Sequence, residues 1–255
     1  MIYGLYLSAT GVLTNSYRQD VIANNLANSE TVGFKKDLAL FQQRRTEAQE
    51  RGFGAGSNAL LEGLGGGVYA SPTRVDTSQG DLEPTGSNLD VAIEGTGYFN
   101  VNDNGQTRLT RDGRFSLDRT GQLILANGRG QAVLDVKGRP IQLDPSLANT
   151  ETTIGKYGEI TQRGRMVAQI GLSDVADPAQ LKKLGGNMMS YPDVAGMRPA
   201  LGVLHANFVE HANVEPATEL TQLMDAQRQL EANANMIRFQ DQTLARLVND
   251  VGKIS

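Results

Sequence analysis

The chain has 255 residues, of which 39% are hydrophobic, enough apolar material for one large domain or two of ordinary size. Its 24 Lys and Arg residues nearly balance its 28 Asp and Glu residues, giving a net charge of −4. This balance argues against nucleic acid or an anionic membrane as a partner and favours protein surfaces. The chain has no cysteine, which excludes disulfides, thiolate catalysis and cysteine-based zinc sites.

Neither a targeting segment nor a membrane span is expected. The first residues lack a basic stretch followed by a continuous apolar run, and no segment approaches the roughly 18 apolar residues of a membrane helix. We therefore expect no cleaved secretory signal and no membrane insertion.

The first predicted element is an amphipathic helix over residues 2–27. Gly4 and Gly11 weaken it, and small polar residues between Asn28 and Gly33 end it before a new segment begins at Phe34. Its apolar stripe consists of Ile2, Leu5, Ala9, Val12, Ala23 and Leu26.

A second amphipathic piece is expected over residues 38–45, followed by a stretch rich in glycine. We assign residues 1–50 to the N-terminal helix and connector of a helical stalk domain, and residues 51–67 to a flexible glycine-rich linker.

Residues 68–212 are predicted to form a central β domain. Short runs rich in β-forming residues alternate with turn residues, a pattern typical of antiparallel hairpins. The predicted strands are 89–93, 98–101, 108–110, 115–117, 123–125 and 141–143, with two more between 159 and 173. The predicted turns are Asn104-Gly105, Asp112-Gly113, Thr120-Gly121, Asn127-Gly128, Lys137-Gly138 and Arg163-Gly164, and residues 178–184 could form one short helix.

The last segment, residues 213–255, is predicted to be one long helix from Pro216 to Gly252, capped by Asn213 or Glu215. At 1.5 Å per residue it would be ~55 Å long, which exceeds the width of a small domain. A seven-residue apolar repeat runs along it and requires partner helices. The repeat consists of Leu223, Leu230, Ile237, Leu244 and Val251.

These elements predict an α+β fold in which the N- and C-terminal helices pair as a coiled-coil-like stalk beside a mostly antiparallel β domain. A buried intramolecular helix pair would explain the same repeat without any subunit contact. Asn24, Asn25 and Asn28 fit ordinary helix capping and turn formation, and contact with a neighbouring subunit is a second role for them.

The sequence predicts no catalytic, metal or cofactor site and no small-molecule substrate. His205 and His211 stand alone, without an HExxH pattern or a cysteine, so a metal site would need carboxylates from elsewhere. The glycines from Gly63 to Gly67 do not form a phosphate-binding loop, and no GxSxG elbow occurs. The basic pairs Lys35-Lys36, Arg44-Arg45 and Lys182-Lys183 are expected to be solvated, and contact with acidic groups of a neighbouring subunit is a second role for the first pair.

Four stretches in chain order resemble the bacterial flagellar rod and hook family, whose members build the axial shaft of the flagellum. The most specific is DVIANNLANSETVGFKK, from Asp20 to Lys36. The others are QGDLEPTGSNLDVAIEGTGYFNV (79–101), continued by LTRDGRFSLDRTGQL (109–123), then DPAQLKKLGGNMMSYPDVAG (177–196) and NVEPATELTQLMDAQRQLEANANMIRFQDQTL (213–244).

The resemblance implies a subunit of the periplasmic rod of the flagellar basal body that is exported through the flagellar channel without cleavage. Its implied partners are copies of itself, other rod and hook subunits and the export apparatus. The chain has no room for the larger outer insertion of hook proteins, which favours a rod subunit, the proximal rod before the distal rod. The expected subunit interface consists of Leu5, Val12, Asn24, Asn25, Leu26, Asn28, Gly33, Phe34, Leu223, Leu230, Ile237, Leu244 and Val251.

Two alternatives come from other classes of protein. One is a secreted β-rich binding or scaffold module that dimerises through its helices, which open-ended assembly would exclude. The other is an enzyme that cleaves cell-wall polysaccharide, for which the sequence offers no carboxylate motif.

Overall fold

The computed structural model describes residues 2–45, 67–147, 151–192 and 196–251, and the chain divides into two compact units. Unit 1 comprises Met1–Leu26, Asp37–Arg74 and Glu215–Ser255, and unit 2 comprises Ala27–Lys36 and Val75–Val214. The chain therefore passes four times from one unit to the other. Residues 27–36 belong to the β unit although both flanking segments belong to the helical unit.

This division differs in three places from the boundaries expected from the sequence, and one of them is residues 213–214, which belong to the β unit. Residues 27–36 belong to the β unit, where the Gly33 N–H donates to the carbonyl oxygen of Glu210 at 2.7 Å. Residues 68–74 belong to the helical unit, where the Tyr17 hydroxyl donates to the Ser71 carbonyl oxygen at 3.3 Å. Apart from Gly67, the expected glycine-rich linker lies outside the described residues.

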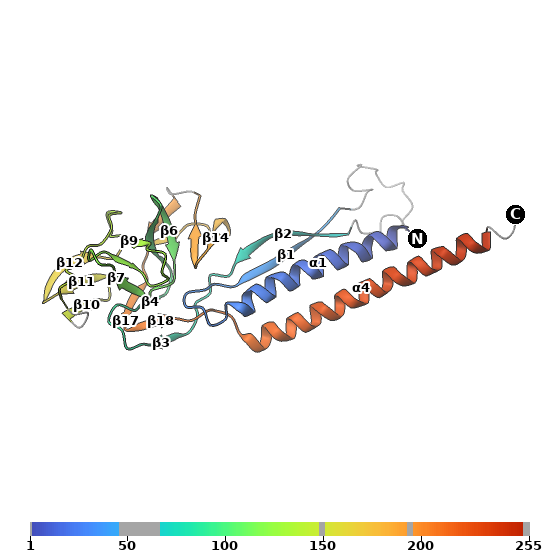
Figure 1. Ribbon diagram of the computed structural model, residues 1–255. Helices are drawn as coiled ribbons and strands as arrows, with labels where there is room; N and C mark the ends of the chain where they lie inside the picture. Colours follow the sequence, from blue (N-terminus) through green and yellow to red (C-terminus); the bar gives the residue numbers. More distant parts are fainter. Residues whose placement is uncertain (1, 46–66, 148–150, 193–195, 252–255) are drawn as a thin grey trace. The chain divides into compact units, whose positions relative to one another are not determined.

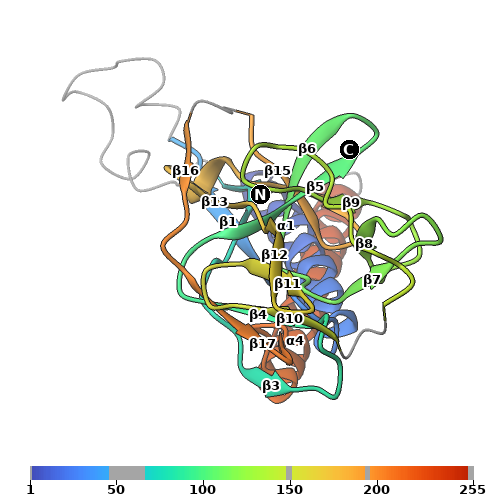
Figure 2. The same ribbon diagram turned by 90° about the vertical axis from the view of Figure 1, so that its left-hand side faces the viewer.

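Unit 1 contains the two terminal helices, α1 (Ile2–Ala27) and α4 (Pro216–Val251), together with the hairpin of β1 (Asp37–Gln43) and β2 (Val68–Val75). The helices lie side by side and run in opposite directions (Figure 1), and they remain neighbours in the view turned by 90° (Figure 2). The predicted pairing of the terminal helices and the α+β fold are thus confirmed. Pro216 occupies the first turn of α4, where its missing N–H costs no helical hydrogen bond.

The amphipathic piece expected over residues 38–45 is strand β1, which pairs with β2 and lies beside α1 (Figure 1). Tyr17 of α1 packs edge-to-face on Phe41 of β1, with ring centroids 6.3 Å apart. An apolar run this short suits either a helix or a strand, and pairing with a distant segment determines which one forms.

Unit 2 is built from antiparallel strands. Its largest sheet has the order β14-β15-β6-β5-β9-β8-β7, with β13 pairing to both β5 and β16. A three-stranded sheet, β10-β11-β12, and two pairs, β17-β4 and β18-β3, complete it. The bounds are β3 Leu82–Pro84, β4 Val91–Glu94, β5 Tyr98–Asp103, β6 Gln106–Thr110, β7 Phe115–Leu117, β8 Leu123–Leu125, β9 Ala132–Val133, β10 Thr152–Ile154, β11 Glu159–Gln162, β12 Arg165–Gln169, β13 Leu172–Val175, β14 Lys182–Gly185, β15 Met188–Ser190, β16 Met197–Pro199, β17 Val203–Ala206 and β18 Phe208–Glu210.

The core of unit 2 lies among β4, β5, β7, β8 and β11. Phe99 and Phe115 meet edge-to-face with ring centroids 5.1 Å apart, and Val91, Leu123 and Ile160 are fully buried around them. Alternate residues of these short strands point to the same face of a sheet, which is why so few residues per strand suffice to build the core.

The predicted hairpin turns are largely confirmed by backbone angles. Asn104 and Gly105 both have positive φ, at 52° and 82°, and Arg163 and Gly164 have 49° and 74°. Gly113 is different, because its φ is not in the left-handed region. Glycine is required there by space, since a Cβ would lie 1.7 Å from the Val91 carbonyl oxygen.

Two other predictions in the β unit are wrong. Residues 141–143 do not form a strand of a sheet and contain a single isolated bridge, between Gln122 and Gln142. Residues 178–184 form only a 3₁₀ turn, η2 (Pro178–Gln180), which the Asp177 side chain caps, before β14 begins. A chain that must next pair with β15 cannot continue as a helix.

Candidate assembly surfaces

The contact between the two helices of unit 1 includes small and polar residues. A Cβ placed on Gly4 would lie 2.8 Å from Gln240 Nε2, and one placed on Gly11 would lie 2.8 Å from Asn233 Nδ2. Both pairs are separated by seven residues on each helix, as an antiparallel heptad register requires. Glycine thus makes room on α1 for the amide side chains of α4.

The apolar repeat predicted on α4 lies next to this contact. Leu223, Leu230, Ile237 and Leu244 are each partly buried, and the intervening Ala226 is fully buried. The side chain of Val251 lies outside the described residues. The repeat therefore serves the intramolecular pair in part, and it keeps some apolar surface uncovered in the single chain.

Further apolar side chains of α4 are exposed. Phe239 is 64% exposed and Val248 is 71% exposed, and neither belongs to the predicted repeat. Exposed large apolar side chains on one element are typical of interaction surfaces. Within the described part of α4, the exposed large apolar residues are Leu220, Met224, Met236, Phe239, Leu247 and Val248.

The predicted apolar interface residues of α1, Leu5, Val12 and Leu26, are all partly buried. Leu13 was not predicted as an interface residue and is 70% exposed. Leu13 lies one position away from Val12 and therefore outside the apolar stripe predicted for this helix.

The asparagines near the end of α1 differ in exposure. Asn24 is exposed and Asn28 partly buried, whereas Asn25 is buried and its side chain holds the backbone of Asp37. Asn25 Nδ2 donates to the Asp37 carbonyl oxygen, and the Asp37 N–H donates to Asn25 Oδ1, both at 2.9 Å. Asn25 therefore fixes the start of β1 against the last turn of α1 within unit 1.

Gly33 and Phe34 are buried in unit 2. Gly33 has a φ of 69°, and a Cβ there would lie 2.4 Å from the backbone of Arg111 and Asp112. Phe34 packs with Ala212 and Val214, and the Lys183 ammonium lies 3.9 Å from the centre of its ring.

A buried cluster of three charged residues adjoins this turn, and sequence reasoning missed it. Lys35 Nζ contacts Glu210 Oε1, and Arg111 Nη1 donates to Glu210 Oε2 at 3.0 Å; the side chains of Lys35 and Glu210 are fully buried. Burial lowers the pKa of Lys35 from its ordinary 10.5, and the Glu210 carboxylate opposes that shift. No local signal predicts this cluster, because Glu210 is 175 residues away from Lys35.

The Arg111 guanidinium also lies 5.3 Å from the centre of the Tyr98 ring. Burial raises the pKa of Tyr98 to about 12, so its phenol is neutral at physiological pH. The contact between Arg111 and Tyr98 joins the buried charges to a second hydrophobic cluster of unit 2, which contains Tyr98, Leu109 and Met189.

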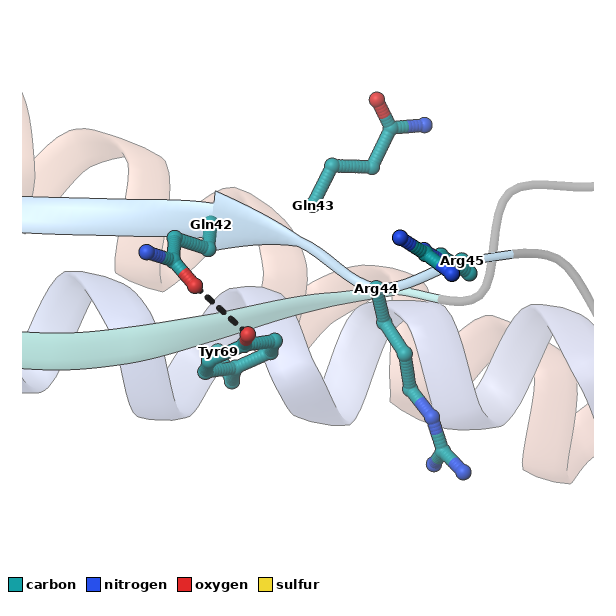
Figure 3. Close-up of a pocket in the computed structure, with 5 residues that line it drawn as sticks. All are labelled: Gln42, Gln43, Arg44, Arg45 and Tyr69. Carbon is teal, nitrogen blue, oxygen red and sulfur yellow. Dashed lines mark hydrogen bonds between the residues drawn. The ribbon is translucent and has the colours of Figure 1, made fainter. Parts of the chain in front are cut away.

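An open hollow near the end of the β1–β2 hairpin is lined by Gln42, Gln43, Arg44, Arg45 and Tyr69 (Figure 3). The Tyr69 hydroxyl donates to Gln42 Oε1 at 2.6 Å, and Arg44 donates to the Tyr6 hydroxyl at 3.3 Å. These polar contacts hold the hairpin together and place it against α1.

The described residues contain no group of three or more histidine and acidic side chains arranged to hold a metal ion. Each histidine pairs with one carboxylate: His205 with Glu94 at 2.6 Å, and His211 with Glu83. None of the helices in the described part of the chain is both long and apolar enough to span a membrane.

Comparison with known families gives matches to three parts of the chain. Residues 92–162 match the flagellar hook protein FlgE/F/G D1 domain, and residues 205–250 match the C-terminal region of flagellar basal body rod FlgEFG proteins. Residues 5–35 match the family described as flagella basal body rod protein.

Curated relatives match along nearly the whole chain. The flagellar basal-body rod protein FlgF of Caulobacter vibrioides is 34% identical over 255 residues, covering 98% of each chain. FlgG of Bacillus subtilis is 34% identical over 272 residues, covering 98% of this chain and 99% of its own length. FlgG of Caulobacter vibrioides is 33% identical over 262 residues, covering 94% and 96%.

The fold and its partly uncovered helices define a class, an α+β structural protein with paired terminal helices. Within that class, the chain belongs to the flagellar basal-body rod protein family. Membership places it in the bacterial flagellar basal body and implies assembly with other rod and hook subunits. The comparisons give no support to the binding-module alternative.

Proposed function

We propose that this chain is a structural subunit of the flagellar rod that assembles with its own copies through the terminal helices. The product would be a hollow shaft that transmits torque from motor to hook and leaves a passage for exported subunits. No bond chemistry is required, because repeated side-chain packing supplies the mechanism.

The exposed apolar residues of α4 are the observation that carries this proposal. Phe239 and Val248 gain little from the intramolecular pair, since most of each side chain remains exposed. Covering one such side chain in an interface would contribute about 1.5–3 kcal/mol. A subunit that offers several of them along one helix gains most when neighbouring copies cover the helix along its length.

The predicted interface residues fall into three groups that differ in burial and in their contacts inside the chain. Leu5, Val12, Leu26, Leu223, Leu230, Ile237 and Leu244 are partly buried and would complete their burial against neighbours. Asn24 and Asn28 keep some accessible surface for the same purpose. Asn25, Gly33 and Phe34 already have contacts inside the chain that explain their burial.

Among rod positions we propose the proximal rod, with the distal rod as the second candidate. The resemblance supports a rod subunit without a large outer insertion. We also propose export through the flagellar channel without a cleaved signal, as the family resemblance implies.

The proposal is tested by single substitutions in the chromosomal gene. Phe239→Ser and Met236→Ser should abolish motility and the recovery of complete basal bodies, while the chain still accumulates outside the cytoplasm. Asn235→Ser, one residue from Met236 on the same helix, should leave both unchanged. Normal basal bodies with Phe239→Ser and Met236→Ser combined would refute assembly through this surface.

The rod position is tested by examining the basal bodies of a strain that lacks the gene. A proximal subunit should leave a remnant without any outer rod segment, because later subunits have nothing to attach to. A remnant that already carries most of the rod would assign the chain to the distal part.

A further inference from the structure

The segment from Val32 to Lys36 is held in unit 2 by a dense set of contacts. Asn187 Nδ2 donates to the Val32 carbonyl oxygen at 2.7 Å, and the Gly33 N–H donates to the Glu210 carbonyl oxygen at 2.7 Å. The Lys36 N–H donates to Asn213 Oδ1 at 2.7 Å. Each bond joins the segment to residues more than 150 positions further along the chain.

Lys35 is the most demanding of these residues. A lysine is almost never fully buried without a partner, because its ammonium loses its hydration. Here the ammonium contacts Glu210 and donates to the Ser78 carbonyl oxygen at 2.7 Å. If the segment left unit 2, the Glu210 carboxylate would keep its hydrogen bonds from Arg111 and the Gly80 N–H. The volume that the Lys35 side chain now occupies among buried residues would become empty.

We propose that Lys35 makes the Val32–Lys36 segment an obligatory part of the β unit, so that unit 2 folds only when this segment is docked. Lys35 acts as a positioning residue. It couples the turn after α1 to β18 through Glu210, which also pairs with Arg111, and its ammonium contacts both the Glu210 carboxylate and the Ser78 carbonyl oxygen. The turn and the β core therefore fold and unfold as one cooperative element.

The proposal gives the turn a role inside the subunit in addition to any contact with neighbours. Where the proposed function holds, it has a consequence for export, which rests on that function. While the chain is emerging from the export channel, its β unit cannot fold until both Lys35 and Glu210 are outside. Because the two residues lie 175 positions apart, most of the chain must be free before folding completes.

Amide exchange on the intact chain tests the coupling without any substitution. The peptide covering residues 28–36 and the peptide covering β5 should exchange with the same opening constant and respond equally to low denaturant. The proposal would be overturned if the amides of residues 28–36 exchanged 100-fold faster than those of β5 while β5 stayed protected. This readout concerns the monomer and is independent of whether rods form.

Two substitutions with a matched control complete the test. Lys35→Met keeps the apolar stem and removes the charge, and Glu210→Gln keeps the shape. Each should lower the folding constant of unit 2 by about 100-fold or more, since Lys35→Met takes one of two cations from the buried Glu210 carboxylate and Glu210→Gln leaves Lys35 and Arg111 without that carboxylate. Lys36→Met is the control, because Lys36 is partly exposed and 3.8 Å from Asp76, and its effect should stay below about 5-fold. Equal, small effects of Lys35→Met and Lys36→Met would show that Lys35 is not required. If the Lys35→Met variant does not fold at all, the amide-exchange experiment on the unaltered chain still shows whether the segment and β5 open together.

Discussion

At the scale of single residues, Asn25 carries a prediction that separates two roles. Its amide side chain makes both hydrogen bonds to Asp37, and Asn25→Ala would leave the two backbone groups of Asp37 without them. We expect a loss of about 1–3 kcal/mol in the stability of unit 1. Thermal unfolding followed by helical circular dichroism would measure it.

A variant Asn25→Ala that keeps full monomer stability and loses only assembly would contradict the intrachain role. It would instead support the interpretation of Asn25 as a subunit contact.

The turn that begins at Asp118 gives a pH-dependent prediction. Hydrogen bonds from the Thr120 side chain and the Gln122 N–H hold the pKa of this carboxyl below its ordinary 3.8. Because the pKa is lower in the folded state, the ionised carboxylate stabilises the fold above that value, and the contribution is lost as the pH falls below about 4. The stability difference between the wild type and Asp118→Asn should therefore shrink between pH 7 and pH 3. Urea midpoints at both pH values would measure it, and a difference independent of pH would contradict this account.

At the scale of elements, the glycine positions of α1 control how closely the helices approach. Gly11→Leu would place a side chain where Asn233 now lies, and we expect a loss of about 1–3 kcal/mol from overpacking. Gly11→Ala is the contrasting variant. Its Cβ meets only the movable end of Asn233, and alanine favours helix by about 1 kcal/mol over glycine.

The pair is tested by a double-mutant cycle measured through helix unfolding. Asn233→Ala combined with Gly11→Leu should recover part of the loss, since it clears the space that leucine needs. Strict additivity of the two effects would mean that Gly11 and Asn233 do not meet.

The elements also show how far sequence reasoning extends. Helices α1 and α4 were predictable because their apolar spacing and end residues are local, and so were turns such as Asn104-Gly105 with its positive φ angles. Strand β1 was not, because its seven residues fit a helix or a strand until β2 pairs with them. The bridge at Gln142 likewise depends on a residue far along the chain, Gln122.

The candidate surfaces were predictable to a similar degree. The repeat from Leu223 to Leu244 was found from spacing alone, and the structure adds that Gln240 and Asn233 fill the positions between its members. The buried state of Lys35 was not predictable, since a Lys-Lys pair is usually solvated and its partner lies 175 residues away. The exposure of Phe239 could be known only after the partner face of α4 was fixed by α1.

At the scale of the whole molecule, the two units have different roles in the proposed subunit. The helical unit keeps apolar side chains uncovered on α4, while the β unit encloses its own core and the turn after α1. Losing a side chain such as Phe239 should therefore affect association between chains far more than the stability of unit 2. Sedimentation of Phe239→Ser beside urea unfolding of its β unit would compare the two effects.

The central claim, open-ended assembly through the terminal helices, is tested most directly by electron microscopy of seeded growth. Purified chain would be added to basal bodies from a strain that lacks it. We predict that wild type and Asn235→Ser extend the seeds as a helical array, whereas Phe239→Ser does not. A chain that forms only closed dimers and adds nothing to the seeds would contradict the account.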